Sequence, residues 1–256
     1  MMRIIILTQS DPFYLAENID YLVNSLPKNS EIVSTVIFDV SPFGKKESFL
    51  KKAKKTLHIF GIRFFTYYSL KFVLNKFNPK KDVYKVLKKH KIPIVTLDKG
   101  INHEESLEKI NVLNPDLLIS IAGNQIFKSE LINLAPKGCL NLHTALLPKY
   151  RGLMPSFWVL KNNEKETGVS VFFVDEGIDS GPIITQKRIP ITKNMTQSEL
   201  ITISKKIGMD AIIESIEKIE SNNYQLIENS EKGKTYFSFP TRKDVSEFYK
   251  NNKKFF

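Results

Sequence analysis

Two polar side chains at the end of an apolar run offer the first chemistry in this sequence. Asn141 and His143 lie two residues apart at the end of residues 138–143 (GCLNLH). Because side chains alternate along a strand, both point to the same face if this run is a strand. An asparagine amide can donate a hydrogen bond to a developing oxyanion, and a histidine can act as a general acid or base near neutral pH. His143 alone would also fit a structural histidine.

A second polar segment, residues 174–182 (VDEGIDSGP), supplies carboxylates and glycines. Either Asp175 or Asp179 can orient the imidazole and stabilise its protonated form. The glycines permit unusual backbone angles and the close approach of a ligand. Cys139 shares strand parity with Asn141, so a cysteine nucleophile stays open beside a core role for this thiol. No serine or cysteine occurs in a nucleophile-elbow motif.

These two segments together resemble one family. Residues 141–152 (NLHTALLPKYRG) followed by residues 168–186 (GVSVFFVDEGIDSGPIITQ) are similar to the folate-dependent formyltransferases. That family includes glycinamide ribonucleotide formyltransferase, methionyl-tRNA formyltransferase and the sugar N-formyltransferases. The resemblance is firm over residues 115–191, looser over 1–40, and lost over 41–81.

The resemblance implies formyl transfer from N10-formyltetrahydrofolate, as co-substrate, to a primary amine, with no metal. Asn141, His143 and Asp179 match the catalytic residues of the family one by one. Two loops match those that surround the pterin, where family contacts are largely through the main chain. The cofactor-binding residues implied in this way are Asn124, Gln125, Ile126, Asp175, Glu176, Gly177 and Ile178.

The acceptor amine is inferred by comparison within the family. Methionyl-tRNA formyltransferases continue into a C-terminal β-barrel domain that grips tRNA, whereas only 65 residues follow residue 191. Glycinamide ribonucleotide formyltransferases carry a glycine-rich phosphate loop after the first strand, and residues 8–15 (TQSDPFYL) contain no glycine. We therefore expect a small anionic amine, an amino sugar carried on a nucleotide. Formylation of methionyl-tRNA or glycinamide ribonucleotide is the alternative. A non-enzymatic folate-fold module that binds membranes through residues 41–81 is the third hypothesis.

The elements that must position these residues alternate between strand and helix. Residues 3–7 predict a buried strand, 12–26 a helix with Asp11 as N-cap and Pro12 at its first position, and 31–40 a second strand. The fold class expected is therefore α/β, a Rossmann-like, mostly parallel sheet with helices on both faces and a small C-terminal appendage. The remaining predicted elements are helix 83–90, strand 93–97, helix 104–113, strand 116–122, helix 125–134, strand 138–143, a helix opening near Pro155, a strand pair at 169–174 and 183–191, and a long helix after the capping box 196–199.

Residues 1–191 are predicted to form the catalytic domain and residues 192–256 a small helical subdomain with a tail. Within the first, residues 41–81 form a basic, aromatic insertion with one acidic residue, Glu47, and two helices broken near Gly61. Two interpretations stay open. Its aromatic faces can belong to the core with solvated lysines outside, or one face can bind an anionic membrane or a phosphorylated acceptor.

Composition sets the outer limits. The chain has 256 residues, a single cysteine and a formal net charge of +11. One cysteine excludes a disulfide scaffold, and no Cys/His cluster has zinc-site spacing. No run approaches the about 20 apolar residues of a membrane span, and no signal peptide is evident, so we expect a cytoplasmic protein. The charge favours an anionic partner, or solubility alone. A homodimer is a further partner that stays open.

Overall fold

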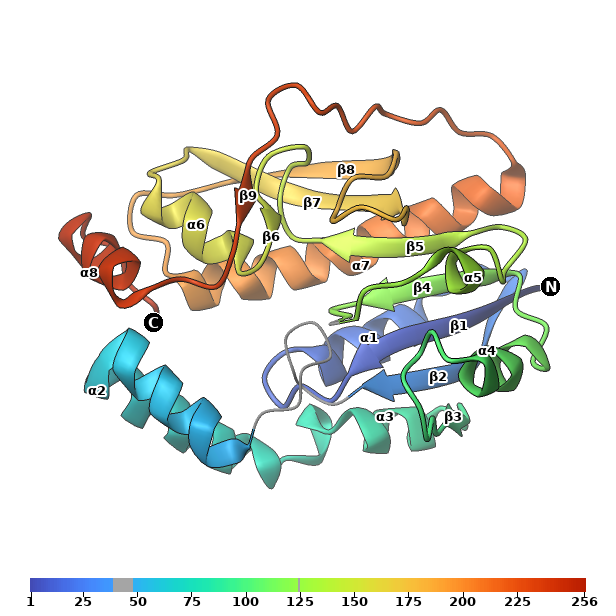
Figure 1. The fold of residues 1–256 in the computed structure, drawn as a ribbon, viewed down its shortest axis with the longest axis horizontal. Helices are drawn as coiled ribbons and strands as arrows, with labels where there is room; N and C mark the ends of the chain where they lie inside the picture. The colour runs from blue at the N-terminus through green and yellow to red at the C-terminus, as the bar shows by residue number, and fades with distance from the viewer. Residues whose placement is uncertain (39–47, 124) are drawn as a thin grey trace.

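The computed structural model describes residues 1–38, 48–123 and 125–256, and its centre is a seven-stranded sheet (Figure 1). The strand order is β3-β2-β1-β4-β5-β7-β8. The first five strands run parallel, while β7 is antiparallel to both β5 and β8. Their bounds are β1 Met2–Gln9, β2 Ser30–Phe38, β3 Ile94–Val95, β4 Leu117–Ile121, β5 Cys139–His143, β7 Glu166–Phe173 and β8 Ile183–Pro190.

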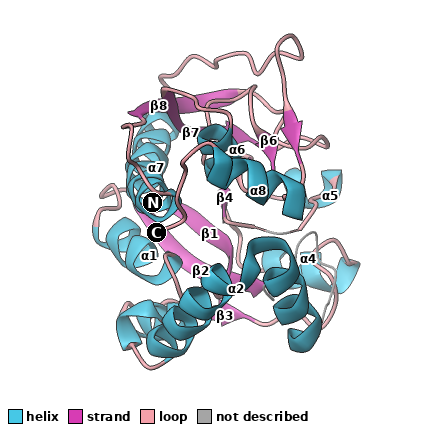
Figure 2. Ribbon diagram, turned by 90° about the vertical axis from the view of Figure 1, so that its left-hand side faces the viewer, coloured by secondary structure: helices cyan, strands magenta, loops and turns pink. Residues whose placement is uncertain are grey.

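Helices cover both faces of this sheet, as Figure 2 shows with α1 and α7 on one side and α4 and α5 on the other. Successive β1 side chains alternate between two apolar clusters: Ile4 and Ile6 belong to one, and Ile5 and Leu7 to the other. The first cluster packs on α1 (Leu15–Asn24), α3 (Val83–Lys89) and α7 (Gln197–Ser221). The second packs on α4 (Glu104–Asn111) and α5 (Ser129–Ile132). The predicted fold class is confirmed.

The long helix α7 begins where the sequence predicts. The Thr196 hydroxyl accepts a hydrogen bond from the backbone N–H of Glu199, and the Glu199 carboxylate accepts from the backbone N–H of Thr196. These two bonds satisfy N–H groups that a helix start otherwise leaves without partners. Leu200, Met209 and Ile212 are buried in the same cluster as the strands, so α7 completes the core of the sheet. The division of the chain at residue 191 stays a prediction.

Two predicted helices are shorter than expected. Helix α1 begins at Leu15 rather than residue 12, and no side chain caps it. Asp11 instead accepts a hydrogen bond from the backbone N–H of Phe13 at 2.8 Å, which closes a local turn that competes with helix at this position. The segment predicted as helix 125–134 contains only α5 (Ser129–Ile132).

The basic, aromatic segment contains one long, kinked helix, α2 (Phe49–Lys76), followed by the 3-10 turn η2 (Pro79–Lys81). Gly61 has φ of 81° and ψ of 172°, so the helix breaks at the predicted glycine, in a conformation that other residues rarely adopt. Residues 41–47 of this segment lie outside the described residues. Across the part of the chain that the structure describes, no helix combines the length and apolar character needed to cross a bilayer.

The tail after α7 passes back over the molecule to α8 (Arg242–Lys250), beside α2 (Figure 1). On its way, β9 (Tyr236–Phe237) pairs in parallel with β6 (Arg151–Gly152), just before α6 (Pro155–Lys161). The sequence analysis predicted neither this two-stranded sheet nor α8. The pairing matters because β6 lies in the loop that follows β5 and carries groups of the site described next.

Candidate active site

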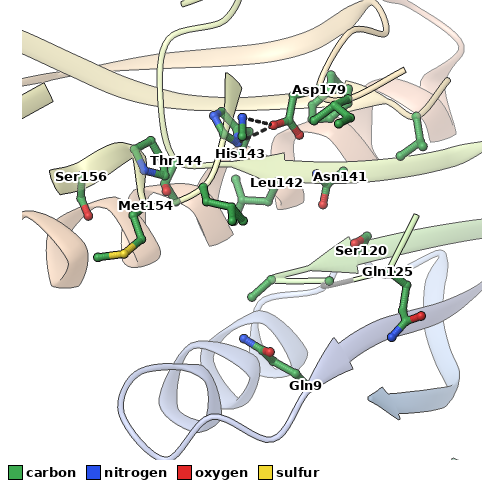
Figure 3. A pocket seen from close by; sticks show the side chains of 18 of the residues that line it. Gln9, Ser120, Gln125, Asn141, Leu142, His143, Thr144, Met154, Ser156 and Asp179 are labelled. Carbon is green, nitrogen blue, oxygen red and sulfur yellow. Dashed lines mark hydrogen bonds and ion pairs between the residues drawn. The ribbon is translucent and has the colours of Figure 1, made fainter. Parts of the chain in front are cut away.

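A cleft of about 530 Å³ opens at the carboxyl ends of β1, β4 and β5 (Figure 3). This is the edge at which open, mostly parallel sheets bind ligands. Gln9 at the end of β1, Ser120 on β4, and Asn141 and His143 on β5 all line it. The predicted pair of polar side chains on β5 therefore belongs to the wall of a cleft.

Asn141 is half-buried, opposite Ser120 of β4 in the sheet register. Cys139, two residues earlier, is 1% exposed and packs with apolar side chains of the cluster under α4 and α5. Burial raises the pKa of its thiol to about 12, and the thiol is absent from the described lining of the cleft. A protonated thiol inside an apolar cluster is a poor nucleophile, so the geometry supports the core role for Cys139.

His143 lies between two hydrogen-bond acceptors. Its Nε2 is 2.7 Å from the backbone carbonyl oxygen of Tyr150, and its Nδ1 is 3.4 Å from Oδ2 of Asp179. The two side chains are 7% and 12% exposed, so water screens their interaction little. An imidazolium can donate to both neighbours at once, whereas a neutral imidazole can donate only to one. The arrangement suits a histidine that carries a proton during part of a reaction.

Of the two carboxylates that the sequence left open, Asp179 is the one beside His143. Its Oδ2 also accepts a hydrogen bond from the backbone N–H of Gly152 at 2.8 Å, which fixes the carboxylate. Asp175 instead accepts from the backbone N–H of Gly177 and the hydroxyl of Ser180, at 3.1 and 2.6 Å. Asp175 therefore shapes the loop that carries Asp179.

The tail of the chain holds this loop in place. The side-chain amide of Asn229 donates hydrogen bonds to the backbone carbonyls of Asp179 and Gly181, both at 2.9 Å. The guanidinium of Arg151, which is buried, donates in turn to the backbone and side-chain oxygens of Asn229. Sequence analysis missed Asn229, since it lies in a polar stretch without a distinguishing pattern.

The segment before α6 is equally constrained. Gly152 has φ of 97°, and a Cβ atom there would lie 2.3 Å from the carbonyl oxygen of Phe237. Only glycine lets β9 approach this closely. Tyr150 and Met154 also adopt positive φ, at 60° and 53°. This loop presents the carbonyl of Tyr150 to His143 and the N–H of Gly152 to Asp179. Its backbone adopts left-handed conformations, and its pairing with β9 of the tail holds it in place.

The residues matched to the pterin loops divide into three groups. Gln125, Ile126, Asp175, Gly177 and Ile178 line the cleft. Glu176 is exposed and does not belong to the described lining. Asn124 lies outside the described residues. A role for any of them in binding folate stays a prediction.

A further wall of the cleft escaped the sequence analysis. It contains Asp11, Ser204 and Lys205, with Gln197 and Ser156 beside them. Burial raises the pKa of the Asp11 carboxyl and lowers the pKa of the Lys205 ammonium, while the opposite charge of each partner acts against these shifts. The hydroxyl of Ser204 is buried without a hydrogen-bond partner in the described structure.

The spacing of residues in α7 could have indicated Ser204 as part of that wall. Leu200, Ser204 and Gly208 recur every four residues, which places Ser204 on the buried face of α7. A hydroxyl on a buried helix face requires a partner, from the protein or from a ligand. Asp11 was interpreted as a helix cap, and its location in the cleft became visible only in the fold.

Comparison with known proteins shows the family of the chain that carries this site. The model of the family described as formyl transferase matches residues 45–216. The chain belongs to the formyl transferase family. It is 37% identical over 166 residues to a methionyl-tRNA formyltransferase of Kosmotoga olearia, covering 64% of this chain and 52% of that protein. A methionyl-tRNA formyltransferase of Clostridium beijerinckii is 34% identical over 171 residues, covering 65% and 55%. The chain thus spans about half the length of these curated relatives.

Solved structures of the formyl transferase family share the fold. A sugar N-formyltransferase from a Shewanella species superposes with a TM-score of 0.61 at 19% identity, covering 98% of this chain and 88% of that one. An N-formyltransferase from Helicobacter canadensis, in complex with folinic acid and dTDP-3-aminofucose, gives 0.56 at 19% identity, covering 93% and 71%. A phosphoribosylglycinamide formyltransferase from Anaplasma phagocytophilum gives 0.63 at 14% identity, covering 94% and 100%.

A metal centre was not expected from the sequence. In the described ranges of the chain, no group of three or more His, Cys, Asp or Glu side chains is arranged to hold a metal ion.

Proposed function

We propose that this chain transfers a formyl group from N10-formyltetrahydrofolate to a primary amine, using Asn141, His143 and Asp179. The observation that carries the proposal is the pairing of His143 with Asp179, at 3.4 Å, on a cleft wall that also bears Asn141. Membership in the formyl transferase family supports the same chemistry.

The three side chains suit distinct parts of this reaction. When the formyl oxygen gains negative charge, the Asn141 amide can donate a hydrogen bond to it, and one such donor contributes about 100- to 1000-fold in rate. A protonated His143 adds positive charge close by. Asp179, fixed by the Gly152 N–H, orients the imidazole. The acceptor nitrogen adds to the formyl carbon, the bond from that carbon to the folate nitrogen then breaks, and the amine proton passes through His143, Asp179 or water to the folate nitrogen.

The wall around residues 125–126 and 175–178 fits a flat heterocycle. Ile126 and Ile178 both line the cleft, yet are 55% and 42% exposed. A bound ligand would therefore find apolar surface to contact there. Gly177 has no room for a side chain, since a Cβ would lie 2.0 Å from the Ser180 hydroxyl. Gly177 therefore lets the loop fold tightly against Ser180 where it lines the cleft. N10-formyltetrahydrofolate would supply the one-carbon unit when bound in this part of the cleft.

The other wall favours an acceptor rich in hydroxyl groups. The Asp11 carboxylate can only accept hydrogen bonds, and the Lys205 ammonium can only donate them. Two neighbouring hydroxyls of a sugar can satisfy both, by donating to Asp11 and accepting from Lys205. Ser204 belongs to the same wall. We infer that the acceptor is an amino sugar, and a nucleotide carrier would suit the net charge of +11.

Methionyl-tRNA is the second candidate acceptor. It is supported by the curated relatives, which are methionyl-tRNA formyltransferases at 31–38% identity. An acceptor screen separates the two. The purified chain, with formylated folate, is offered a panel of nucleotide-linked amino sugars and, separately, charged initiator tRNA, with His143→Ala as the inactive control. Formylation of a sugar and not of tRNA supports our proposal. Exclusive formylation of tRNA, with steeply salt-dependent binding, would replace the sugar acceptor by tRNA. Formylation of neither class, with wild type no different from His143→Ala, would contradict the enzyme assignment.

A further inference from the structure

The second half of α2, together with its C-cap Phe77, carries an exposed apolar stripe. Ile62, Leu70, Val73, Leu74 and Phe77 are 50–78% exposed. Their spacing of three, four, seven and eight residues is that of one helix face. Isolated apolar residues on a surface need no explanation, but a contiguous row along a helix marks a site of contact. Before the kink, Phe49, Leu50 and Leu57 are also exposed.

This stripe is separate from the face by which α2 packs on the molecule. Phe64 stacks on Phe60 and Tyr68, and it meets Phe255 edge-on, with ring centroids 4.6, 5.2 and 4.8 Å apart. Tyr68 in turn stacks on Phe13 at 4.3 Å. The helix is therefore fixed to the body through one aromatic face, and the exposed apolar stripe is a second face that the core does not require.

The charge of this segment restricts what can cover the stripe. Residues 48–81 contain no Asp or Glu. They contain nine basic residues, namely Lys51, Lys52, Lys54, Lys55, Arg63, Lys71, Lys76, Lys80 and Lys81. Lys81 is paired with Glu17 of α1, and this pairing leaves the segment strongly positive. A partner must therefore present both negative charge and an apolar layer.

We propose that α2 binds in the plane of a bilayer containing anionic phospholipids, with the stripe of Ile62, Leu70, Val73, Leu74 and Phe77 immersed at the headgroup boundary. Lysine side chains reach from an immersed helix to lipid phosphates, and apolar side chains enter the acyl region. A second copy of this chain fits less well, because it would bring two such basic helices together. Nucleic acid supplies negative charge but no apolar layer for the stripe.

Vesicle flotation with the full chain tests this proposal. Vesicles of phosphatidylcholine with 30% phosphatidylglycerol are compared with phosphatidylcholine alone. We expect binding only to the anionic vesicles. The double variant Leu70→Ser/Leu74→Ser should lower the partition coefficient about tenfold or more, because each leucine loses its apolar burial. Lys51→Gln/Lys54→Gln, at two exposed lysines, should lower it by about fivefold for each lysine. Val112→Ser, which alters an equally exposed apolar residue on the far side of the sheet, should bind as the wild type does.

A fluorescent reporter provides a second measurement. In a Trp158→Phe background, Phe77→Trp should shift its emission to shorter wavelength with anionic vesicles, as an indole does on leaving water. Three outcomes would overturn the proposal: no binding to anionic vesicles, binding that Leu70→Ser/Leu74→Ser leaves unchanged, or a dimer in solution that the same variant dissociates. Loss of tRNA binding in that variant, without vesicle binding, would assign the surface to RNA. None of these readouts requires formyl transfer.

Discussion

The side chain of Asn229 donates a hydrogen bond to the backbone carbonyl of Asp179, 50 residues earlier in the chain. The same amide group also reaches the carbonyl of Gly181, so one side chain spans the end of the loop that positions the carboxylate. Asp179 in turn faces His143. The arrangement of the site therefore depends on a residue of the tail that lies outside both sequence motifs.

Replacing Asn229 tests this dependence. Asn229→Ala leaves the carbonyls of Asp179 and Gly181 without their donor and removes one of the acceptors of Arg151, and should lower the free energy of unfolding by about 1–3 kcal/mol. Because Asp179 then loses its support, kcat should fall about tenfold or more with little change in KM, and the pH dependence of kcat should change. Asn223→Ala, at an exposed position, is the control. A folded Asn229→Ala variant with wild-type kcat and pH profile would show that the tail does not position the carboxylate.

Removal of Asn141 or His143 should abolish most turnover without releasing folate. We expect kcat to fall about 100- to 1000-fold for Asn141→Ala, and about 100- to 10000-fold for His143→Ala. Titration calorimetry with the folate co-substrate should give nearly unchanged affinity in both variants. Asn133→Ala removes an exposed amide elsewhere and should leave kcat unchanged. Full activity of either site variant would eliminate the proposed mechanism.

Cys139 is expected to have no chemical role. Its thiol is buried and has a pKa of about 12, so thiol reagents should modify the native chain slowly at neutral pH. Cys139→Ala should lower the free energy of unfolding by about 1 kcal/mol and leave kcat unchanged. Since this is the sole cysteine of the sequence, labelling reports on it alone. A Cys139→Ala variant that is stable but inactive would reopen nucleophilic catalysis.

Asp11 should give acceptor binding a dependence on pH. Burial raises the pKa of its carboxyl above 3.8, so on acidification it takes up a proton earlier than a solvent-exposed aspartate does. KM for the acceptor should rise as the pH falls through that raised pKa. Asp11→Asn should raise KM about tenfold at neutral pH and abolish this dependence.

The raised pKa of Asp11 also determines how the stability of the fold changes with pH. A folded-state pKa above the unfolded value contributes stability that is fully present below pH 3.8 and is lost as the pH rises through the raised pKa. Asp11→Asn should therefore not lower the thermal midpoint at neutral pH. Asp98→Asn, at an exposed carboxylate outside the described lining of the cleft, is the control for the acceptor KM. An unchanged acceptor KM in Asp11→Asn would remove Asp11 from the acceptor wall.

Two glycines with similar backbone angles should differ in their tolerance of alanine. Gly152 and Gly233 have φ of 97° and 81°, but only at Gly152 would a Cβ meet another atom, the carbonyl oxygen of Phe237 at 2.3 Å. Gly233→Ala should cost about 1–2 kcal/mol, the strain of a left-handed residue. Gly152→Ala should cost more and also lower kcat, because the Gly152 N–H holds Asp179. Urea unfolding and steady-state kinetics measure both, and equal losses would contradict the contact with β9.

Local patterns made much of this architecture predictable. The capping box of Thr196 and Glu199 forms through neighbours in sequence, and the apolar run of residues 117–121 is a strand because it is buried on both faces. The pairing of Asn141 with His143 follows from strand alternation alone. Gly61 broke α2 as expected, since its side chain is absent.

Contacts between distant segments escaped prediction. The carboxylate of Asp11 accepts a hydrogen bond from the backbone N–H of Phe13, which resembles the contact of a helix cap. Only the packing of α7 brings Asp11 to the same cleft as Lys205. Strands β6 and β9 have two residues each and lie about 85 positions apart in the sequence. Strands this short show no hydrophobic periodicity from which they could be predicted. Parts of the site that depend on the tail were therefore invisible before the fold was known.

Phe13 joins two regions with different tasks. Its ring stacks on Tyr68 of α2, and its backbone N–H is bonded to the carboxylate of Asp11 in the cleft. One ring pair and one hydrogen bond therefore form a direct structural link between α2 and the wall of the cleft that contains Asp11. If binding at α2 changes the affinity of the cleft for the acceptor through this link, thermodynamic reciprocity requires the acceptor to change the affinity of α2 for its binding partner by the same factor.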